Sequence, residues 1–207
     1  MQEVQEQPLG GLRERKKWRT HKALSLAAGE LVTARGLESV TVEDIAAAAD
    51  VSVRTFFNYF SCKEEAIVGV EPGVLAEMAE ELRQRPTDES PAEALRAVLL
   101  AEVDADGMLR RWRLRNELVQ RYPNLLPRYL ASMVELEDVL TTALADRIGV
   151  DEHKDHRPRV LVAAALAVLR STLGWWADDA NRSTTKKLTD VLERTFATLV
   201  PDLPRNE

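Results

Sequence analysis

The stretch that decides the fold is Thr41–Phe60, which reads TVEDIAAAADVSVRTFFNYF. Thr41 is followed three residues later by Asp44, which is the spacing of a helix N-cap, and Ser52 can cap a second short helix after a break at Asp50. Neither helix is long enough to bury much surface alone. We therefore expect the two to cross as a helix-turn-helix that leaves its second helix exposed.

The second helix of this pair has one face for the core and one for a partner. At 100° per residue, Phe56 and Phe60 fall together and should face the core. The opposite face and its flanks carry Arg54, Thr55, Phe57, Asn58 and Tyr59. A guanidinium suits guanine or phosphate, a carboxamide suits adenine or phosphate, and a phenol can hydrogen-bond a backbone oxygen. This face can therefore read a DNA major groove, although such a face is also found on ordinary solvated helices.

Helices are predicted on both sides of this pair, because Ala, Leu, Glu and Arg dominate between short breaks and alternating strand patterns are absent. The first helix should cover 12–35 and stop at Gly36. A fourth should begin at 61–64, with Ser61 and Glu64 at capping-box spacing, be interrupted at Pro72-Gly73 and continue to about residue 85. Further helices are expected at about 91–105, 107–121, 125–148, 157–179 and 184–199.

The predicted fold class is all-α, with two domains. A three-helix helix-turn-helix DNA-binding domain is expected at 12–63 and a larger helical ligand-binding and dimerisation domain at 64–207. Residues 1–63 hold nine basic and eight acidic residues, whereas the remainder holds 19 and 26. Six of the basic residues lie within 13–22, and such a basic arm beside a DNA-reading helix would contact phosphates.

Three runs together resemble the DNA-binding signature of the TetR family of transcriptional regulators: Thr41–Ala46, Val51–Phe60 and Lys63–Ala66. The resemblance covers roughly residues 15–68. It implies a homodimer whose two recognition helices enter successive major grooves of an operator, and a repressor released when a small molecule binds the C-terminal domain. Two positions depart from the family pattern: Phe57 stands where Tyr is frequent, and Cys62 where a capping Ser, Asn or Asp is usual.

The resemblance also assigns roles by position. Thr41, Tyr59 and Lys63 would hold phosphates, while Arg54, Thr55 and Asn58 would approach bases. The full set of expected DNA-binding residues is Thr41, Ser52, Arg54, Thr55, Phe57, Asn58, Tyr59 and Lys63, together with Arg13, Lys16, Lys17 and Arg19 of the arm. A frayed, solvated N-terminus is the alternative for the arm.

Two apolar helix faces in the C-terminal half predict contact surfaces. The run 160–169 is almost wholly apolar, and a second stripe comprises Leu188, Val191, Leu192, Phe196 and Leu199. A helix that is apolar all round needs cover on every side, which a second subunit or the chain's own core can supply. The candidate residues for a largely apolar effector pocket are Met78, Leu82, Trp112, Arg115, Asn116, Tyr122, Tyr129, Met133, Leu169, Arg170 and Trp175, each of which could equally be ordinary core.

Other functional classes find less support. The three histidines, His21, His153 and His156, form no catalytic or metal-binding constellation, and neither a Gly-rich phosphate loop nor a nucleophile elbow is present, so we expect no enzyme, metal or cofactor. Cys62, the single cysteine, fits a reducing cytoplasm; beside Lys63 it could sense redox state, but a Ser-like structural role is the simpler interpretation. The alternative function is a helical protein–protein interaction module that no longer binds DNA.

Overall fold

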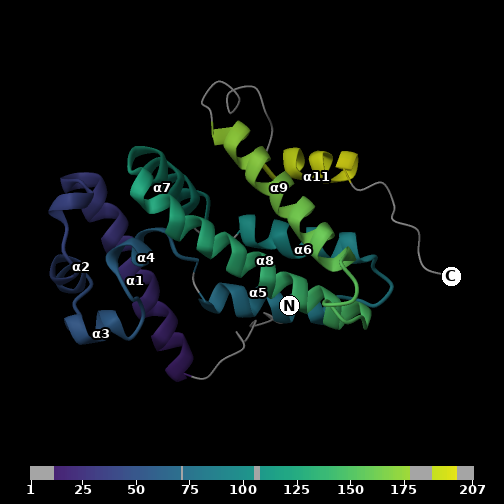
Figure 1. Cartoon of the computed structure of the whole chain (residues 1–207), viewed down its shortest axis with the longest axis horizontal. Helices are drawn as coiled ribbons and strands as arrows, with labels where there is room; N and C mark the ends of the chain where they lie inside the picture. The colour runs from purple at the N-terminus through teal and green to yellow at the C-terminus, as the bar shows by residue number, and fades with distance from the viewer. Residues whose placement is uncertain (1–11, 71, 105–107, 178–187, 200–207) are drawn as a thin grey trace, which may run out of the picture.

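The computed structural model describes residues 12–70, 72–104, 108–177 and 188–199, and the regular elements of these residues are all helices (Figure 1). In chain order they are α1 (Leu12–Arg35), η1 (Leu37–Ser39), α2 (Val42–Ala48), α3 (Val53–Phe57), α4 (Lys63–Val68), α5 (Pro72–Gln84), α6 (Pro91–Asp104), α7 (Met108–Arg121), η2 (Pro123–Leu125), α8 (Leu126–Ile148), α9 (Arg157–Ala177) and α11 (Leu188–Leu199). The expected all-α class is confirmed. Helices α1–α4 gather at one end of the molecule, and α5, α6, α8, α9 and α11 form the larger body.

The helix-turn-helix is built by the caps that the sequence predicts. Asp44 N donates to Thr41 Oγ1 at 3.1 Å and Thr41 N donates to Asp44 Oδ2 at 2.9 Å, so the capping box of α2 is complete. Thr55 N donates to Ser52 Oγ at 3.0 Å and caps α3. Between the two helices Asp50 has a φ of 53°, in the left-handed region that Asp tolerates better than most residues. The third helix, expected to reach Phe60, ends at Phe57.

The predicted fourth helix is in fact two helices. The chain leaves α4 at Gly69 and starts α5 at Pro72, because proline suits the first position of a helix. The expected pairing of Ser61 with Glu64 is also wrong. Ser61 N and Oγ both donate to Oε2 of Glu65, at 2.7 and 2.6 Å.

Two hydrophobic cores hold the helices together, and α7 packs against both. The N-terminal core comprises side chains of α1 to α4, with Leu118 of α7 and Leu125 of η2 buried among them. The second core is formed by α5, α6, α8, α9 and α11, and the partly buried Leu109 and Trp112 of α7 pack against it. The body is therefore tied to the DNA-binding end through α7, and α8 also contacts α4.

Helix α9 is long and apolar enough to cross a membrane by length and composition, over Arg157–Trp176. It packs, however, against α8 and α11, with Val162, Ala165 and Val168 buried there. Its other face is exposed and consists mainly of small or apolar side chains: Val160, Ala164, Ala167, Ser171 and Trp175. We interpret α9 as a core helix with one uncovered face, since a lone apolar helix of this kind is weak evidence for a membrane span.

Candidate DNA-binding surface and effector cavity

The outward face of α3 presents the side chains that could read DNA. Arg54 and Asn58 are exposed, and Phe57 retains 55% of its exposure. Phe56 and Phe60 are buried in the N-terminal core, as the helical spacing predicts. The intermediate side chains, Thr55 and Tyr59, lie at the edge between these two faces. An exposed guanidinium and carboxamide on a short capped helix form a surface suited to base edges or phosphates.

Three of the residues expected to bind DNA already make bonds within the protein. The Lys63 ammonium donates to the carbonyl oxygens of Leu37 and Val40, both at 2.8 Å, and so fixes the turn that precedes α2. Thr41 and Ser52 cap α2 and α3. An ammonium has three donors, so Lys63 keeps one for a phosphate. The sequence could not reveal this role, because the bonds of Lys63 span 23 and 26 residues.

The basic arm lies on the first turns of α1. Lys16, Lys17 and Arg19 are exposed there, beside the helix-turn-helix. Arg13 belongs to α1, but its side chain lies outside the described part of the structure. Together with Arg54 of α3, these exposed cations place positive charge at this end of the protein, which favours binding to phosphate.

His21 is a core residue, not a member of the exposed arm. It is 5% exposed, and its ring centroid lies 4.4 Å from that of Phe60 and 6.2 Å from that of Tyr59. Burial lowers the pKa of His21 to about 4, although the nearby Glu65 carboxylate opposes this shift. The burial of His21 could have been predicted from the sequence, because His21 precedes Leu24 by three residues and thus continues the buried stripe of α1.

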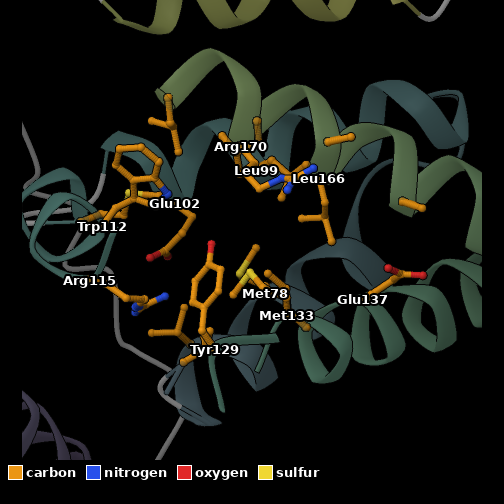
Figure 2. Close-up of a pocket in the computed structure, with 18 of the residues that line it drawn as sticks. Met78, Leu99, Glu102, Trp112, Arg115, Tyr129, Met133, Glu137, Leu166 and Arg170 are labelled. Carbon is orange, nitrogen blue, oxygen red and sulfur yellow. The ribbon is translucent and has the colours of Figure 1, made fainter. Parts of the chain in front are cut away.

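The body contains a cavity of about 280 Å³ between α5, α6, α7, α8 and α9 (Figure 2). Its walls are mainly apolar and include three methionines, Met78, Met108 and Met133, with aromatic rings from Trp112 and Tyr129. The other lining residues are Val70, Val74, Leu99, Glu102, Arg115, Leu130, Leu136, Glu137, Ala163, Leu166, Ala167, Leu169, Arg170 and Leu173. Its size is near the lower limit of small-molecule sites, roughly 300 Å³.

The structure brings some of the pocket residues expected from the sequence to this cavity and leaves others elsewhere. Met78, Trp112, Arg115, Tyr129, Met133, Leu169 and Arg170 line it. Leu82, Asn116, Tyr122 and Trp175 do not: Leu82 is fully buried in the second core, Tyr122 packs against the first, and Trp175 is 49% exposed at the far end of α9. Whether any lining residue binds an effector stays a prediction.

Arg115 is the lining cation that lies deepest. Its Nη2 donates to the carbonyl oxygen of Gly69 at 3.4 Å, and its buried Nε has no hydrogen-bond partner among the described residues. Burial lowers the pKa of Arg115. Figure 2 shows Arg115, Glu102 and Trp112 on the same side of the cavity, with the Tyr129 ring between them and the methionines.

A polar junction links α8 to the start of α4. The Arg128 guanidinium contacts Ser61 Oγ, Cys62 Sγ at 3.6 Å and Glu65 Oε2 at 3.0 Å. Although burial opposes it, the hydrogen bonds from Ser61 and the charge of Arg128 lower the pKa of Glu65. Cys62 caps α4 without a side-chain hydrogen bond to its backbone. Among the described residues, no group of three or more His, Cys, Asp or Glu side chains could hold a metal ion.

Comparisons with known families agree with this organisation. Residues 26–67 match the family described as bacterial regulatory proteins, tetR family, and residues 89–204 match the MftR C-terminal domain. The chain is 40% identical over 175 residues to the HTH-type transcriptional regulator TcmR of Streptomyces glaucescens, covering 80% of this chain and 76% of TcmR. It is 29% identical over 176 residues to MftR of Mycobacterium tuberculosis, a transcriptional regulator of mycofactocin biosynthesis by name, covering 84% and 88%.

Solved structures share the fold. Thermus thermophilus FadR, a TetR-family repressor in complex with lauroyl-CoA, is 26% identical with a TM-score of 0.53, covering 90% of this chain and 96% of FadR. The SmeT–triclosan complex is 22% identical with a TM-score of 0.52, covering 91% and 99%. The second likeness bears on the fold alone.

Proposed function

The chain belongs to the TetR family of bacterial transcriptional regulators, and we propose that it is a homodimeric repressor released from its operator by a small molecule. The proposal that the protein binds DNA rests on the outward face of α3, where Arg54 and Asn58 are exposed while Phe56 is buried. The relatives are regulators by name, and we propose no catalytic step for this chain.

The residues of the N-terminal end divide into two roles. Arg54 and Asn58 would form hydrogen bonds with base edges, with Thr55 and Phe57 packed beside them. The remaining donors would bind phosphates and set the orientation on DNA: Thr41, Ser52, Tyr59, Lys63 and the arm residues Arg13, Lys16, Lys17 and Arg19. Base contacts carry sequence preference and phosphate contacts do not, so the two roles are separable by experiment.

Selection of bound fragments from random DNA, followed by titration of variants, tests this assignment. Arg54→Ala and Asn58→Ala should each weaken binding to the selected site by about 1–3 kcal/mol and relax its sequence preference. Lys63→Ala should weaken binding to selected and random DNA alike. Equal losses on both DNAs for all three variants would refute the division of roles, and no retention of any DNA at low salt would refute the function itself.

A second copy of the chain would cover the uncovered face of α9. Its small side chains, Ala164 and Ser171, allow two helices to approach closely, and α11 lies beside α9 to widen the contact (Figure 1). We place the dimer in the cytoplasm, where the single Cys62 stays reduced and DNA is accessible. Within each subunit we retain the proposed division into 12–63 for DNA and 64–207 for effector and dimer.

The cavity supports the effector half of the proposal. FadR, which is 26% identical, was solved with lauroyl-CoA, an elongated apolar chain on a polar carrier. In this chain the cavity reaches Val70, in the segment between α4 and α5, so an occupant would touch the connection to the DNA-binding end. A ligand that favours one tilt of α4 would change the spacing of the two recognition helices, and half-sites about 34–36 Å apart tolerate little change.

A further inference from the structure

The charges around the cavity are unevenly paired. Glu102 lies 4.0 Å from the Arg111 guanidinium, and Glu137 lies 3.4 Å from that of Arg159. Neither Arg111 nor Arg159 lines the cavity, so both lining carboxylates have a positive partner outside it. Of the two lining cations, Arg170 is exposed, whereas the deeper Arg115 has one hydrogen-bond acceptor among the described residues, the carbonyl oxygen of Gly69 at 3.4 Å.

The donors of Arg115 are therefore incompletely satisfied. Its Nε is buried and has no partner among the described residues, and a bond of 3.4 Å lies beyond the usual range for N–H···O. A buried charged donor without an acceptor is costly, because it has lost its water and gained nothing in return. An oxygen acceptor inside the cavity would recover that cost, and an anionic acceptor would recover most.

We propose that the effector is a small apolar molecule that carries an acidic group, and that Arg115 binds this group. The inference rests on the proposed function and names the ligand class for its cavity. The apolar part would lie against Met78, Met133 and Leu166, which occupy the side of the cavity away from Arg115 in Figure 2. The acid would lie beside the Tyr129 ring, whose hydroxyl offers a further donor.

The position of Arg115 also explains how binding of an acid in the cavity could affect the DNA-binding end. Its Nη2 makes a long hydrogen bond, 3.4 Å, to the carbonyl of Gly69, the residue at which the chain leaves α4. A carboxylate competes for the same guanidinium and forms a stronger, shorter bond than a backbone carbonyl. Binding of an acid would therefore weaken the hold of α7 on the end of α4, without any change in the DNA-reading side chains.

Calorimetric titration of the full chain with three matched probes tests the proposal: decanoate, 1-decanol and decylamine, each below its micelle-forming concentration. The apolar chain is the same in all three, so differences report the head group. Decanoate should bind about 10–100-fold more tightly than 1-decanol, which is the range expected for a hydrogen bond to a charged group. Equal binding of acid and alcohol, tighter binding of the amine, or no binding of any probe would overturn the proposal.

Variants assign the preference to Arg115. Arg115→Gln should reduce the ratio between acid and alcohol to within about threefold, and Arg115→Lys should restore part of it, because charge returns without the planar fork. Arg121→Gln is the matched control, since Arg121 lies on the same helix, is exposed and does not line the cavity. Circular dichroism melts test whether each variant is folded. If Arg115→Gln does not fold, the proposal is tested by Arg115→Lys and by the ratio of acid to alcohol affinity in the wild type.

Retention of selected DNA by the free wild-type protein is measured alongside. If DNA is retained but acid and alcohol bind equally, the ligand class is wrong and the proposed function stands. If DNA is not retained, the proposed function itself fails, whatever the probes do.

Discussion

Acidification should destabilise this protein through His21. The folded protein holds this side chain in the N-terminal core, where burial lowers its pKa from 6.5 to about 4. The unfolded chain exposes the ring, so its pKa returns towards 6.5. The perturbation that tests this is a change of pH from 7.5 to 5.0, a window in which the unfolded chain takes up a proton and the folded protein does not.

The sign and size follow from linkage. Because the folded pKa is below the unfolded one, stability is complete above about pH 6.5 and is lost as the pH falls towards 4. Over the full window the loss is about 3 kcal/mol, at about 1.4 kcal/mol per pH unit, and between pH 7.5 and 5.0 it is about 2 kcal/mol. For a chain of this length, such a loss lowers Tm by roughly 4–8 °C.

Thermal or denaturant unfolding at the two pH values measures the effect, with one variant and one control. His21→Phe keeps an aromatic ring beside Phe60 but removes the proton, so its loss of stability over the window should be smaller by about 2 kcal/mol. His153→Ala removes an exposed histidine and should behave like the wild type. If His21→Phe loses as much stability as the wild type, the buried neutral histidine is not the cause.

Three further outcomes are expected. Deletion of residues 1–17 shortens α1 but should leave the fold intact, weaken DNA binding and reduce the slope of log affinity against log salt; an unchanged slope would show that the arm does not contact phosphate. Gly73→Ala should lower stability by about 1–3 kcal/mol in a denaturant melt, because the added Cβ would overlap the Trp18 indole, and an unchanged midpoint would contradict that contact. The ion pair of Arg128 with Glu65 should show a coupling below about 1 kcal/mol in a double-mutant cycle, because both side chains are about a third exposed; a value above about 2 kcal/mol would refute this.

Local chemistry made the fold predictable where caps and breaks are strong. The first helix has the predicted bounds, and Thr41 and Ser52 cap the next two as expected. The fourth helix was mispredicted because Pro72 can either bend a helix or start one, and tertiary packing decides between them. The pairing of Ser61 with Glu65 rather than Glu64 has a similar origin, since Arg128 of a distant helix holds the Glu65 carboxylate.

The candidate sites were predictable to different degrees. The reading face of α3 follows from one helix wheel, because a short helix has only one side to bury. The cavity depends on five helices, and a sequence does not say which apolar side chain meets a void and which meets a neighbour. Leu82 and Met133 look alike in sequence, yet the first is fully buried in the core and the second lines the cavity. The pairing of Glu102 with Arg111 is likewise invisible without the packing.

The packing of α7 against both cores bears on how such regulators could be recombined. Leu118 and Leu125 belong in sequence to the effector-binding half, yet both are buried with the residues of α1 to α4. Losing a buried leucine costs about 2–5 kcal/mol, which is a large part of the stability of a typical domain, about 5–15 kcal/mol. A chimera that joins this DNA-binding domain to the effector-binding domain of another regulator would have two cavities in its N-terminal core. Side chains of matching shape from the new domain would have to fill them. Exchange of DNA-binding domains between relatives is therefore restricted to partners whose α7 and η2 fit the N-terminal core, which constrains how new operator–effector combinations can arise.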